Sequence, residues 1–245
     1  MKPNEVHDAV AEQGFFGSLL MLSRSDRRDE ELIRRFAEAA SSRNALISEQ
    51  DMEVLHRVSG ANFFMLQILI CEVIPLLQSA PSEVMGLVEL LVEKGGEDLA
   101  ANQPNAAFRK WCGSDSRRAN DVIASARDGD ALALRHLVFA LEAKCDVQEA
   151  FRSAEANGAE RTAGVLALSR MLLSQEEAER ALAHILKLVD ATEAGEGAGF
   201  LTAAIDIAAK HPGLDRSELA KSLDQISESN TPLTIHFMAT ALHGH

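Results

Sequence analysis

The sequence has few aromatic residues: they make up 4% of its 245 positions, with one Trp and no Tyr. β-Sheets favour aromatic and β-branched side chains, so this shortage argues against a β-rich fold. Ala, Leu, Glu and Arg are abundant instead, and these residues are good helix formers. Apolar residues (47%) and charged residues (25%) occur in the proportions of an ordinary globular protein. The composition therefore predicts an all-α protein.

Cysteines are also scarce. The three of them, Cys71, Cys112 and Cys145, are 41 and 33 residues apart. An odd number at this spacing is typical neither of a disulfide framework nor of a Cys-x-x-Cys metal site. Free cysteines are typical of a reducing compartment, so we expect a cytoplasmic protein. Arg outnumbers Lys 17 to 7 in an Ala-rich chain, which favours a bacterial source.

A basic stripe is missing as well. Lys and Arg number 24 against 37 Asp and Glu, which gives a formal net charge of −13. Proteins that bind nucleic acids usually carry a basic face, because neutralising phosphates supplies much of the affinity. We therefore expect no nucleic-acid partner.

Neither a secretory signal nor a membrane span is expected. Residues 1–10 lack a cationic region followed by an apolar core. The strongest apolar run, residues 61–77, is short for a bilayer span and is interrupted by Gln67, Glu72 and Pro75. We interpret this run as a buried helix.

The second half of the sequence repeats itself. Apolar or small residues recur at i, i+3, i+4 and i+7, the spacing of one helix face, in four segments whose first members are 31, 36 and 34 residues apart. The four faces are Leu134, Leu137, Val138 and Leu141; Val165, Leu168 and Leu172, with Ser169 as the weak member; Leu201, Ala204, Ile205 and Ala208; and Ile235, Met238, Ala239 and Leu242. Another apolar face precedes each of them: Ala119, Val122, Ile123 and Ala126; Val147, Ala150, Phe151 and Ala154; Ala178, Ala181, Leu182 and Ile185; and Leu219, Leu223 and Ile226. Four helix pairs are predicted over residues 116–245.

Turn and cap residues fall between these helices. Turns within the pairs are expected at 127–130, 157–158, 195–199 and 229–232. Helix starts carry side chains that can accept hydrogen bonds from unpaired backbone N–H groups: Asp146, Ser174 with Glu177, Asp215 with Glu218, and Thr231 before Pro232. The run His211–Pro212–Gly213 is expected to end a helix.

Residues 1–115 are predicted to be helical but less regular. Helices are expected near 4–22, 29–41, 48–59, 61–79, 82–94 and 104–112. Ser48 is the expected cap of the third helix, and Ser79 or Ser82 that of the fifth. Gly60 either separates two helices or kinks a longer one. No long polar stretch resembles a linker, so residues 1–245 are expected to form a single domain.

Stacked helix pairs of this length resemble the HEAT-like (armadillo/HEAT) α-helical repeat family. The likeness covers residues 116–245 well and residues 48–112 poorly, and it rests on apolar pattern. It implies a short right-handed α-solenoid of stacked antiparallel helix pairs, whose inner surface binds a partner.

Motifs for catalysis and cofactor binding are lacking. The sequence contains no GxxxxGK[ST] phosphate loop, no GxGxxG after a strand, no HExxH and no GxSxG. Glu72 is interpreted as the polar margin of its helix, and a buried carboxylate able to act as an acid or base is the alternative. Cys112, at a helix end beside Trp111, is interpreted as an inert thiol. We expect no cofactor and no enzymatic activity.

The histidines are not expected to bind a metal or to catalyse a reaction. His56 and His136 are isolated helical residues, interpreted as surface or hydrogen-bonded core residues. His236, His243 and His245 cluster near the C-terminus, but a metal site would need a third ligand that is fixed in space.

The candidate interaction surface is the row that lies one residue beyond each repeated face. Its proposed contact residues are Arg135, Phe139, Arg170, Asp206, His236 and Thr240. Arg and aromatic side chains among polar neighbours are typical of protein–protein interfaces. The alternative is that apolar members such as Phe139 pack between repeats. We expect a non-catalytic protein-interaction or assembly module.

Two other functions stay open. A helical-repeat nucleic-acid processing protein would need a basic concave groove. A small-molecule-binding helical enzyme would need a deep pocket with converging titratable groups, expected around Glu72 and residues 61–79.

The last predicted helix, residues 234–243, is apolar on more than one face. The terminal repeat of a solenoid needs a polar outer face. We therefore expect this helix to be covered by further residues after His245 or by another chain, as part of a larger protein or complex.

Overall fold

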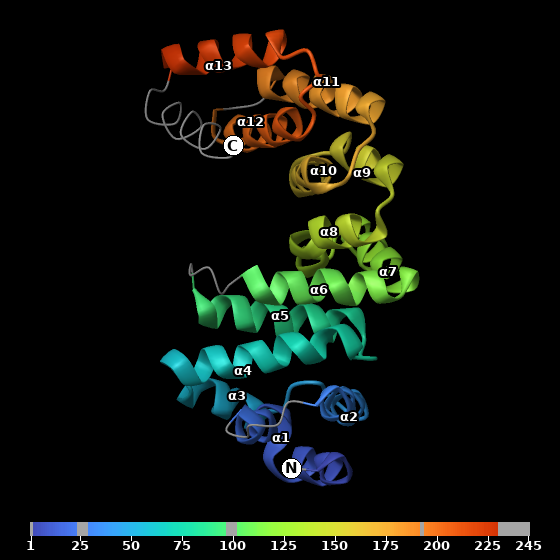
Figure 1. Cartoon of the computed structure of the whole chain (residues 1–245), viewed down its shortest axis with the longest axis vertical. Coiled ribbons are helices and arrows are strands. Elements are labelled where there is room, and N and C mark those ends of the chain that lie inside the picture. The colour runs from blue at the N-terminus through green and yellow to red at the C-terminus, as the bar shows by residue number, and fades with distance from the viewer. Residues whose placement is uncertain (1, 24–28, 97–101, 192–193, 230–245) are drawn as a thin grey trace. The chain divides into compact units, whose positions relative to one another are not determined.

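The computed structural model describes residues 2–23, 29–96, 102–191 and 194–229. Within these ranges every regular element is helical, with thirteen α-helices, two short 3-10 helices and no strand (Figure 1). The all-α prediction is confirmed. The chain divides into two compact units, each of which is described by itself.

The first unit comprises Met1–Lys144. Its elements are η1 (Pro3–Glu5), α1 (Val6–Ser23), α2 (Glu30–Ser41), α3 (Glu49–Arg57), α4 (Gly60–Val73), η2 (Ile74–Leu76), α5 (Pro81–Gly95), α6 (Asn102–Ser114), α7 (Ser116–Arg127) and α8 (Ala131–Lys144). Helix α5 packs against α6, and α7 packs against α8. In addition, α5 contacts α7, while α6 contacts both α4 and α8. Helix α5 also contacts α8, so each helix from α5 to α8 packs against several others of this unit.

Large side chains fill the core of the first unit. Phe15, Phe16, Phe36 and Phe108 are fully buried, and Trp111 is 1% exposed. These residues supply the largest apolar areas that a side chain can remove from water. The aromatic residues, although few, are therefore concentrated where they stabilise this unit.

The second unit comprises Cys145–His245. Its described helices are α9 (Val147–Ala154), α10 (Gly158–Arg170), α11 (Gln175–Ala191), α12 (Ala194–Lys210) and α13 (Ser217–Ser229). Helix α9 packs against α10, and α11 packs against α12. Between successive pairs, α10 contacts α12 and α11 contacts α13. The guanidinium carbon of Arg180 on α11 also lies 3.9 Å from the centre of the Phe151 ring on α9. In this unit, contacts thus join successive helix pairs through α9 and α11, α10 and α12, and α11 and α13.

Small residues let α9 and α10 come close together. A Cβ atom at Gly164 would lie only 2.2 Å from the backbone nitrogen of Ala154, so no other residue fits there without a shift of backbone. Ala150 and Ala154 are fully buried on α9. Close contact between α9 and α10 therefore accompanies the buried Phe151 and Phe200 rings in the core of the second unit.

Most of the predicted helix starts and ends are confirmed. The Ser48, Asp146 and Ser174 caps each accept a hydrogen bond from the backbone N–H three residues on. The side chain of Asp215 accepts from the N–H of Ser217 instead, at 2.9 Å, so the box predicted with Glu218 is wrong. Helix α12 ends directly before the Pro-Gly run, as expected.

Two predictions about the second unit are wrong. Leu172 was expected on a buried face, but its side chain is 98% exposed, because α10 ends two residues earlier. The glycine-rich residues 195–199 were expected to form a loop, but they belong to the first turns of α12. The predicted helix 234–243 and its Thr231–Pro232 start lie outside the described residues.

One prediction about the first unit is wrong, and the structure decides between the two alternatives for Gly60. Ala80, rather than Ser79 or Ser82, precedes α5, and the Glu83 carboxylate accepts from its N–H at 3.3 Å. Gly60 begins α4 with a positive φ of 54°, which separates α3 and α4 into two helices rather than kinking one. None of the described helices combines the length and the apolar character that crossing a membrane requires.

Candidate interaction surface

Two of the six predicted contact residues lie on α8 in the first unit. Arg135 is exposed, and its Nε lies 3.2 Å from a carboxylate oxygen of Glu89 on α5. Phe139 is half-buried, with its ring centre 6.3 Å from that of His136. Both side chains therefore have contacts within their own unit, which supports the packing alternative for Phe139.

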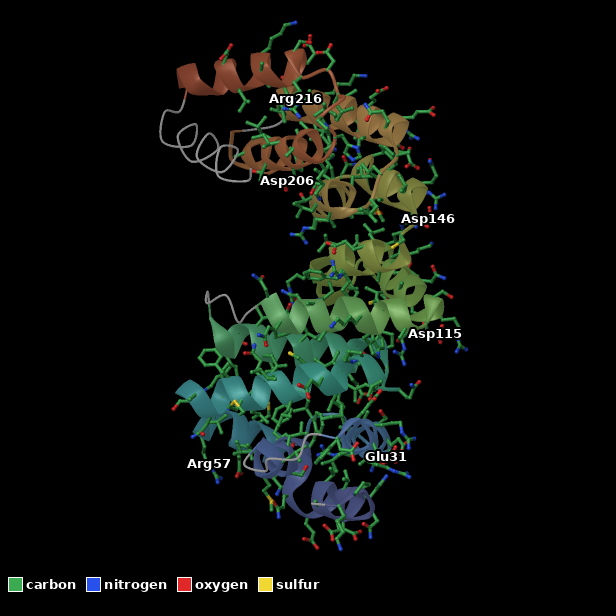
Figure 2. All side chains as sticks on the ribbon, in the orientation of Figure 1. Glu31, Arg57, Asp115, Asp146, Asp206 and Arg216 are labelled. Atoms are coloured by element: carbon green, nitrogen blue, oxygen red, sulfur yellow. The ribbon has the colours of Figure 1, made fainter. Side chains whose placement is uncertain are left out.

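Two others lie on neighbouring helices of the second unit. Arg170 is the last residue of α10, Asp206 lies in α12, and both are exposed (Figure 2 labels Asp206). The Nζ of Lys210, one helical turn after Asp206, donates to the carbonyl oxygen of Ser169, the residue before Arg170. This contact places Lys210 beside the end of α10, and Asp206 lies one turn earlier on the same helix α12. We name the pair Arg170 and Asp206 the exposed pair.

The remaining two predicted contact residues, His236 and Thr240, lie outside the described residues. The structure thus places two of the six predicted residues on helices that contact each other, α10 and α12. It places Arg135 and Phe139 in the other compact unit.

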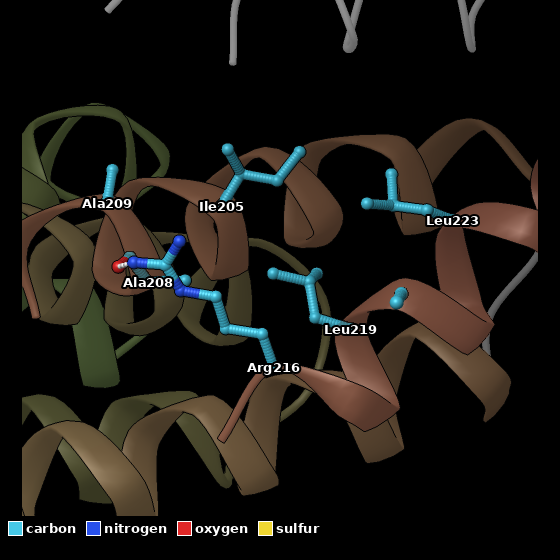
Figure 3. Close-up of a pocket in the computed structure, with 7 residues that line it drawn as sticks. Ile205, Ala208, Ala209, Arg216, Leu219 and Leu223 are labelled. Atoms are coloured by element: carbon cyan, nitrogen blue, oxygen red, sulfur yellow. Dashed lines mark hydrogen bonds between the residues drawn. The ribbon is translucent and has the colours of Figure 1, made fainter. Parts of the chain in front are cut away.

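An open apolar groove lies between α12 and α13, and its lining residue Ile205 directly precedes Asp206 in the sequence. Its volume is about 280 Å³. The lining residues are Ile205, Ala208, Ala209, Arg216, Leu219, Ala220 and Leu223 (Figure 3). Six of the seven are apolar, so the groove suits apolar side chains. None of the seven is a carboxylate, histidine or nucleophile, which argues against acid–base chemistry in it.

Arg216, the only charged residue among the described residues that line this groove, hydrogen-bonds to the protein backbone. A guanidinium nitrogen of Arg216 donates to the carbonyl oxygen of Ala208 at 2.8 Å (Figure 3). In a continuing helix this carbonyl would accept from the residue four positions on, but that residue is Pro212, which has no N–H. Arg216 therefore satisfies a carbonyl that the proline leaves without its helical donor.

Two other arginine side chains also donate hydrogen bonds to backbone carbonyl oxygens near helix ends. A guanidinium nitrogen of Arg118 donates to the carbonyl oxygen of Leu77 at 2.7 Å, just after η2. Arg161 donates through Nε to the carbonyl oxygen of Ala156 at 2.9 Å. Carbonyls at helix ends carry partial negative charge and lack intrahelical donors, so cations are well suited to them. These arginines need no phosphate ligand to explain them.

His136 is buried without a hydrogen bond. It is 2% exposed, its ring centre lies 4.9 Å from that of Phe108, and both ring nitrogens lack hydrogen-bond partners. Its Nε2 is 3.2 Å from a carboxylate oxygen of Glu89, but the two groups are not aligned for a hydrogen bond. Burial lowers the pKa of His136 more than Glu89 raises it, so the ring is neutral near pH 7. The core interpretation is confirmed, except for the expected hydrogen bonds.

The sequence interpretation missed the buried carboxylate of Asp51. One oxygen accepts from the N–H of Phe16 at 2.9 Å, and the other accepts from Arg43 at 2.8 Å and from the hydroxyl of Ser48 at 2.7 Å. The α1 backbone kinks at Gly14, where a Cβ would lie 2.7 Å from this carboxylate. The only related signal in the sequence was the predicted Ser48 cap, which lies three residues before Asp51. Every contact here is structural, so we assign Asp51 to the fold.

The groups considered for chemistry in the sequence have no catalytic surroundings. Glu72 is exposed on α4, so the margin interpretation is confirmed. Neither the α12–α13 groove nor the hollow of about 430 Å³ between residues 45–47 and α5 is lined by it. Burial raises the pKa of the Cys112 thiol to about 12, which keeps it protonated and inert.

Metal ligands do not converge in the part of the chain that the structure describes. No group of three or more His, Cys, Asp or Glu side chains there is placed to hold an ion. The three histidines that cluster near the C-terminus lie outside these residues: His236, His243 and His245.

Comparison of the chain with protein-family models, with curated proteins and with solved structures finds no match. The site must therefore be interpreted from its own geometry.

Proposed function

We propose that the chain is a non-catalytic protein-interaction or assembly module, and that its helix pairs form a short HEAT-like α-solenoid. Contacts between alternate helices within each unit support the solenoid: α5 contacts α7 and α6 contacts α8, while α10 contacts α12 and α11 contacts α13. In such a stack each pair contacts its neighbours, and the outer ends of the helices present a continuous surface.

The observation that carries the proposal is the exposed pair. Arg170 and Asp206 present opposite charges on adjoining helices, and each is exposed. A mixed surface of this kind selects a protein partner by charge complementarity. The lining of the neighbouring groove is apolar and carries no acid–base pair, which favours binding over catalysis.

Charge reversal of the exposed pair tests this function. The double variant Arg170→Glu plus Asp206→Arg keeps the net charge but inverts the pattern. A matched control is Lys187→Glu plus Asp190→Arg, since both of these residues are exposed on α11. Thermal unfolding of both variants checks that each remains folded.

Affinity capture with quantitative mass spectrometry is the measurement. We expect the wild type and the α11 control to recover the same partner, and the exposed-pair variant to recover about tenfold less of it, a loss of about 1.4 kcal/mol. Equal recovery by both double variants would overturn the proposed surface. Retention of the chain on DNA at about 0.15 M salt would favour the nucleic-acid alternative instead.

A further inference from the structure

His136 on α8 is a buried polar side chain that packing alone does not explain. It is 2% exposed, and neither of its ring nitrogens has a hydrogen-bond partner. A buried polar group without a partner keeps the full cost of its desolvation, whereas an apolar ring of similar size would not carry that cost. The fold therefore holds this histidine at a cost in stability.

The groups nearest the His136 ring come from α5, α6 and α8 itself. Oε1 of Glu89 on α5 lies 3.2 Å from Nε2 of His136. Oε2 of the same carboxylate lies 3.2 Å from Nε of Arg135, the residue before His136. On α6, the centre of the Phe108 ring is 4.9 Å from that of His136. Glu89 thus lies between a permanent cation and a ring that becomes a cation when it takes up a proton.

The side chains that α6 and α7 bury are uncharged. They are Pro104, Ala107, Phe108, Trp111 and Cys112 on α6, and Ala119, Val122, Ile123 and Ala126 on α7. Arg109, the charged residue after Phe108, binds Glu142 further along α8 at 2.9 Å. Among the described residues, the charges that act on the ring are Glu89, which favours its protonated form, and Arg135, which disfavours that form.

Burial has the largest effect on the charge of the ring. It disfavours the protonated form more than Glu89 favours it, so the pKa of His136 lies below the ordinary 6.5. Water is nearest on the side of α5, because the side chains of Glu89 and Arg135 are 37% and 57% exposed, whereas Phe108 is fully buried. A ring that must reach water to hold a proton therefore leaves between α5 and α8.

We propose that His136 makes the contact between α5 and α8 sensitive to acid: when the buried ring takes up a proton, the two helices separate and the ring reaches water. The opened state binds protons with the ordinary affinity of a histidine, and the closed state binds them more weakly. Acid below about pH 6.5 therefore favours the opened state. Between about pH 7.5 and pH 5.5 the opening equilibrium rises by at most about tenfold. This device needs no binding partner, so it stands or fails independently of the proposed function.

Hydrogen exchange followed by mass spectrometry on the full chain, at about pH 7.5 and about pH 5.5, tests this proposal. Each measured rate is divided by the chemical exchange rate at the same pH, so that the ratio reports the opening alone. We expect peptides from α5 and α8 of the wild type to lose protection by roughly three- to tenfold at the lower pH. Peptides from α1 and α2 should keep their protection.

Variants at two histidines decide whether His136 is the sensor. His136→Phe suits the aromatic surroundings but cannot titrate, so the acid response of α5 and α8 should vanish. His56→Gln changes an exposed histidine of α3 and should respond as the wild type does. If His136→Phe loses protection throughout the first unit already at about pH 7.5, His136→Gln replaces it, because an amide cannot titrate either.

Glu89→Gln separates the effect of burial from that of ion pairing. The Glu89 carboxylate favours the protonated ring in the closed state, so its removal should leave the acid response as large as in the wild type or make it larger. Glu93→Gln, at an exposed position of the same helix, is the matched control and should respond as the wild type does.

Four results would overturn the inference. Two of them concern the wild type: equal protection of α5 and α8 at both pH values, or an equal loss of protection in α1 and α2, since the whole unit would then unfold. The others are an undiminished acid response in the His136 variant that cannot titrate, and a loss of the response in Glu89→Gln.

Discussion

The two compact units hold their helices together by different means. In the first unit, polar side chains reach groups far away in sequence: Asp51 binds the backbone of Phe16, and Trp111 donates through Nε1 to the carbonyl oxygen of Leu77 at 2.9 Å. In the second unit, helices approach through small residues such as Ala154 and Gly164. Both units have apolar cores, but the first adds buried polar contacts between distant residues, and the second adds a close approach of two helices at small residues.

This difference predicts which substitutions each unit tolerates without a loss of stability. A buried carboxylate stabilises only while all of its donors are present, because any group left unpaired keeps its full cost of desolvation. A close helix contact tolerates changes elsewhere on the helix but not an added side-chain atom at the point of approach. Substitutions of these two kinds should therefore show how the stabilisation of the two units differs.

The largest effect is expected from Asp51→Ala in the first unit. Removing this carboxylate leaves Arg43, the Ser48 hydroxyl and the Phe16 N–H without their acceptor. We expect a loss of about 3–5 kcal/mol in the free energy of unfolding. The control is Asp29→Ala, which removes only an exposed cap that accepts from the N–H of Glu31. Urea denaturation measures both, and equal losses would contradict the special role of Asp51.

A smaller loss is expected from Gly164→Ala in the second unit. The new methyl group would lie 2.2 Å from the backbone nitrogen of Ala154, so the two helices must separate. We expect a loss of about 1–3 kcal/mol. Gly199→Ala in α12, where nothing lies within 4 Å, should leave stability unchanged or raise it by up to about 1 kcal/mol. If both variants behave alike in denaturation, the close approach does not matter.

A loss of about 1 kcal/mol is expected from Ser174→Ala at the start of α11. The Ser174 hydroxyl and backbone N–H both donate to Glu177 at 2.8 Å, and these bonds lower the pKa of the Glu177 carboxyl. The pKa of Glu177 should therefore rise towards 4.5 in the variant. NMR titration of the carboxyl checks this, and an unchanged pKa would show that the Ser174 hydroxyl does not bind Glu177.

The mildest effect near pH 7 concerns His136. Burial holds its pKa below the ordinary 6.5, so the unfolded chain takes up a proton at a higher pH than the folded chain does. Its contribution to stability is therefore complete above pH 6.5 and declines as the pH falls below that value, by at most about 1.4 kcal/mol per pH unit. His136→Gln should flatten this part of the pH profile in denaturation experiments. A profile identical to that of the wild type would exclude the effect.

The helices were predictable because amphipathic periodicity is a local signal. The faces beginning at Ala119 and Ala178 are buried as predicted, since each helix hides its apolar side against a neighbour. Leu172 could not be placed from spacing alone, because the spacing does not show that α10 ends at Arg170. Asp51 was missed because its partners Phe16 and Arg43 are brought to it only by the tertiary fold.

The candidate surface was predictable only in part, for the same reason. Spacing identified exposed positions on α10 and α12, but it could not show that Arg135 contacts Glu89 on α5. A row of equivalent positions is a property of the repeat, whereas the contacts of each member depend on neighbouring helices. The exposed pair Arg170 and Asp206 is what remains of the predicted row in the second unit among the described residues.

Site-specific photo-crosslinking in cells tests the central proposal most directly. A photoreactive phenylalanine derivative is introduced at Asp206 in one sample and at Lys187, on α11, in another; both positions are exposed. We expect a discrete protein adduct from position 206 and none from position 187. Adducts of equal yield from both positions, or no adduct from position 206, would contradict it.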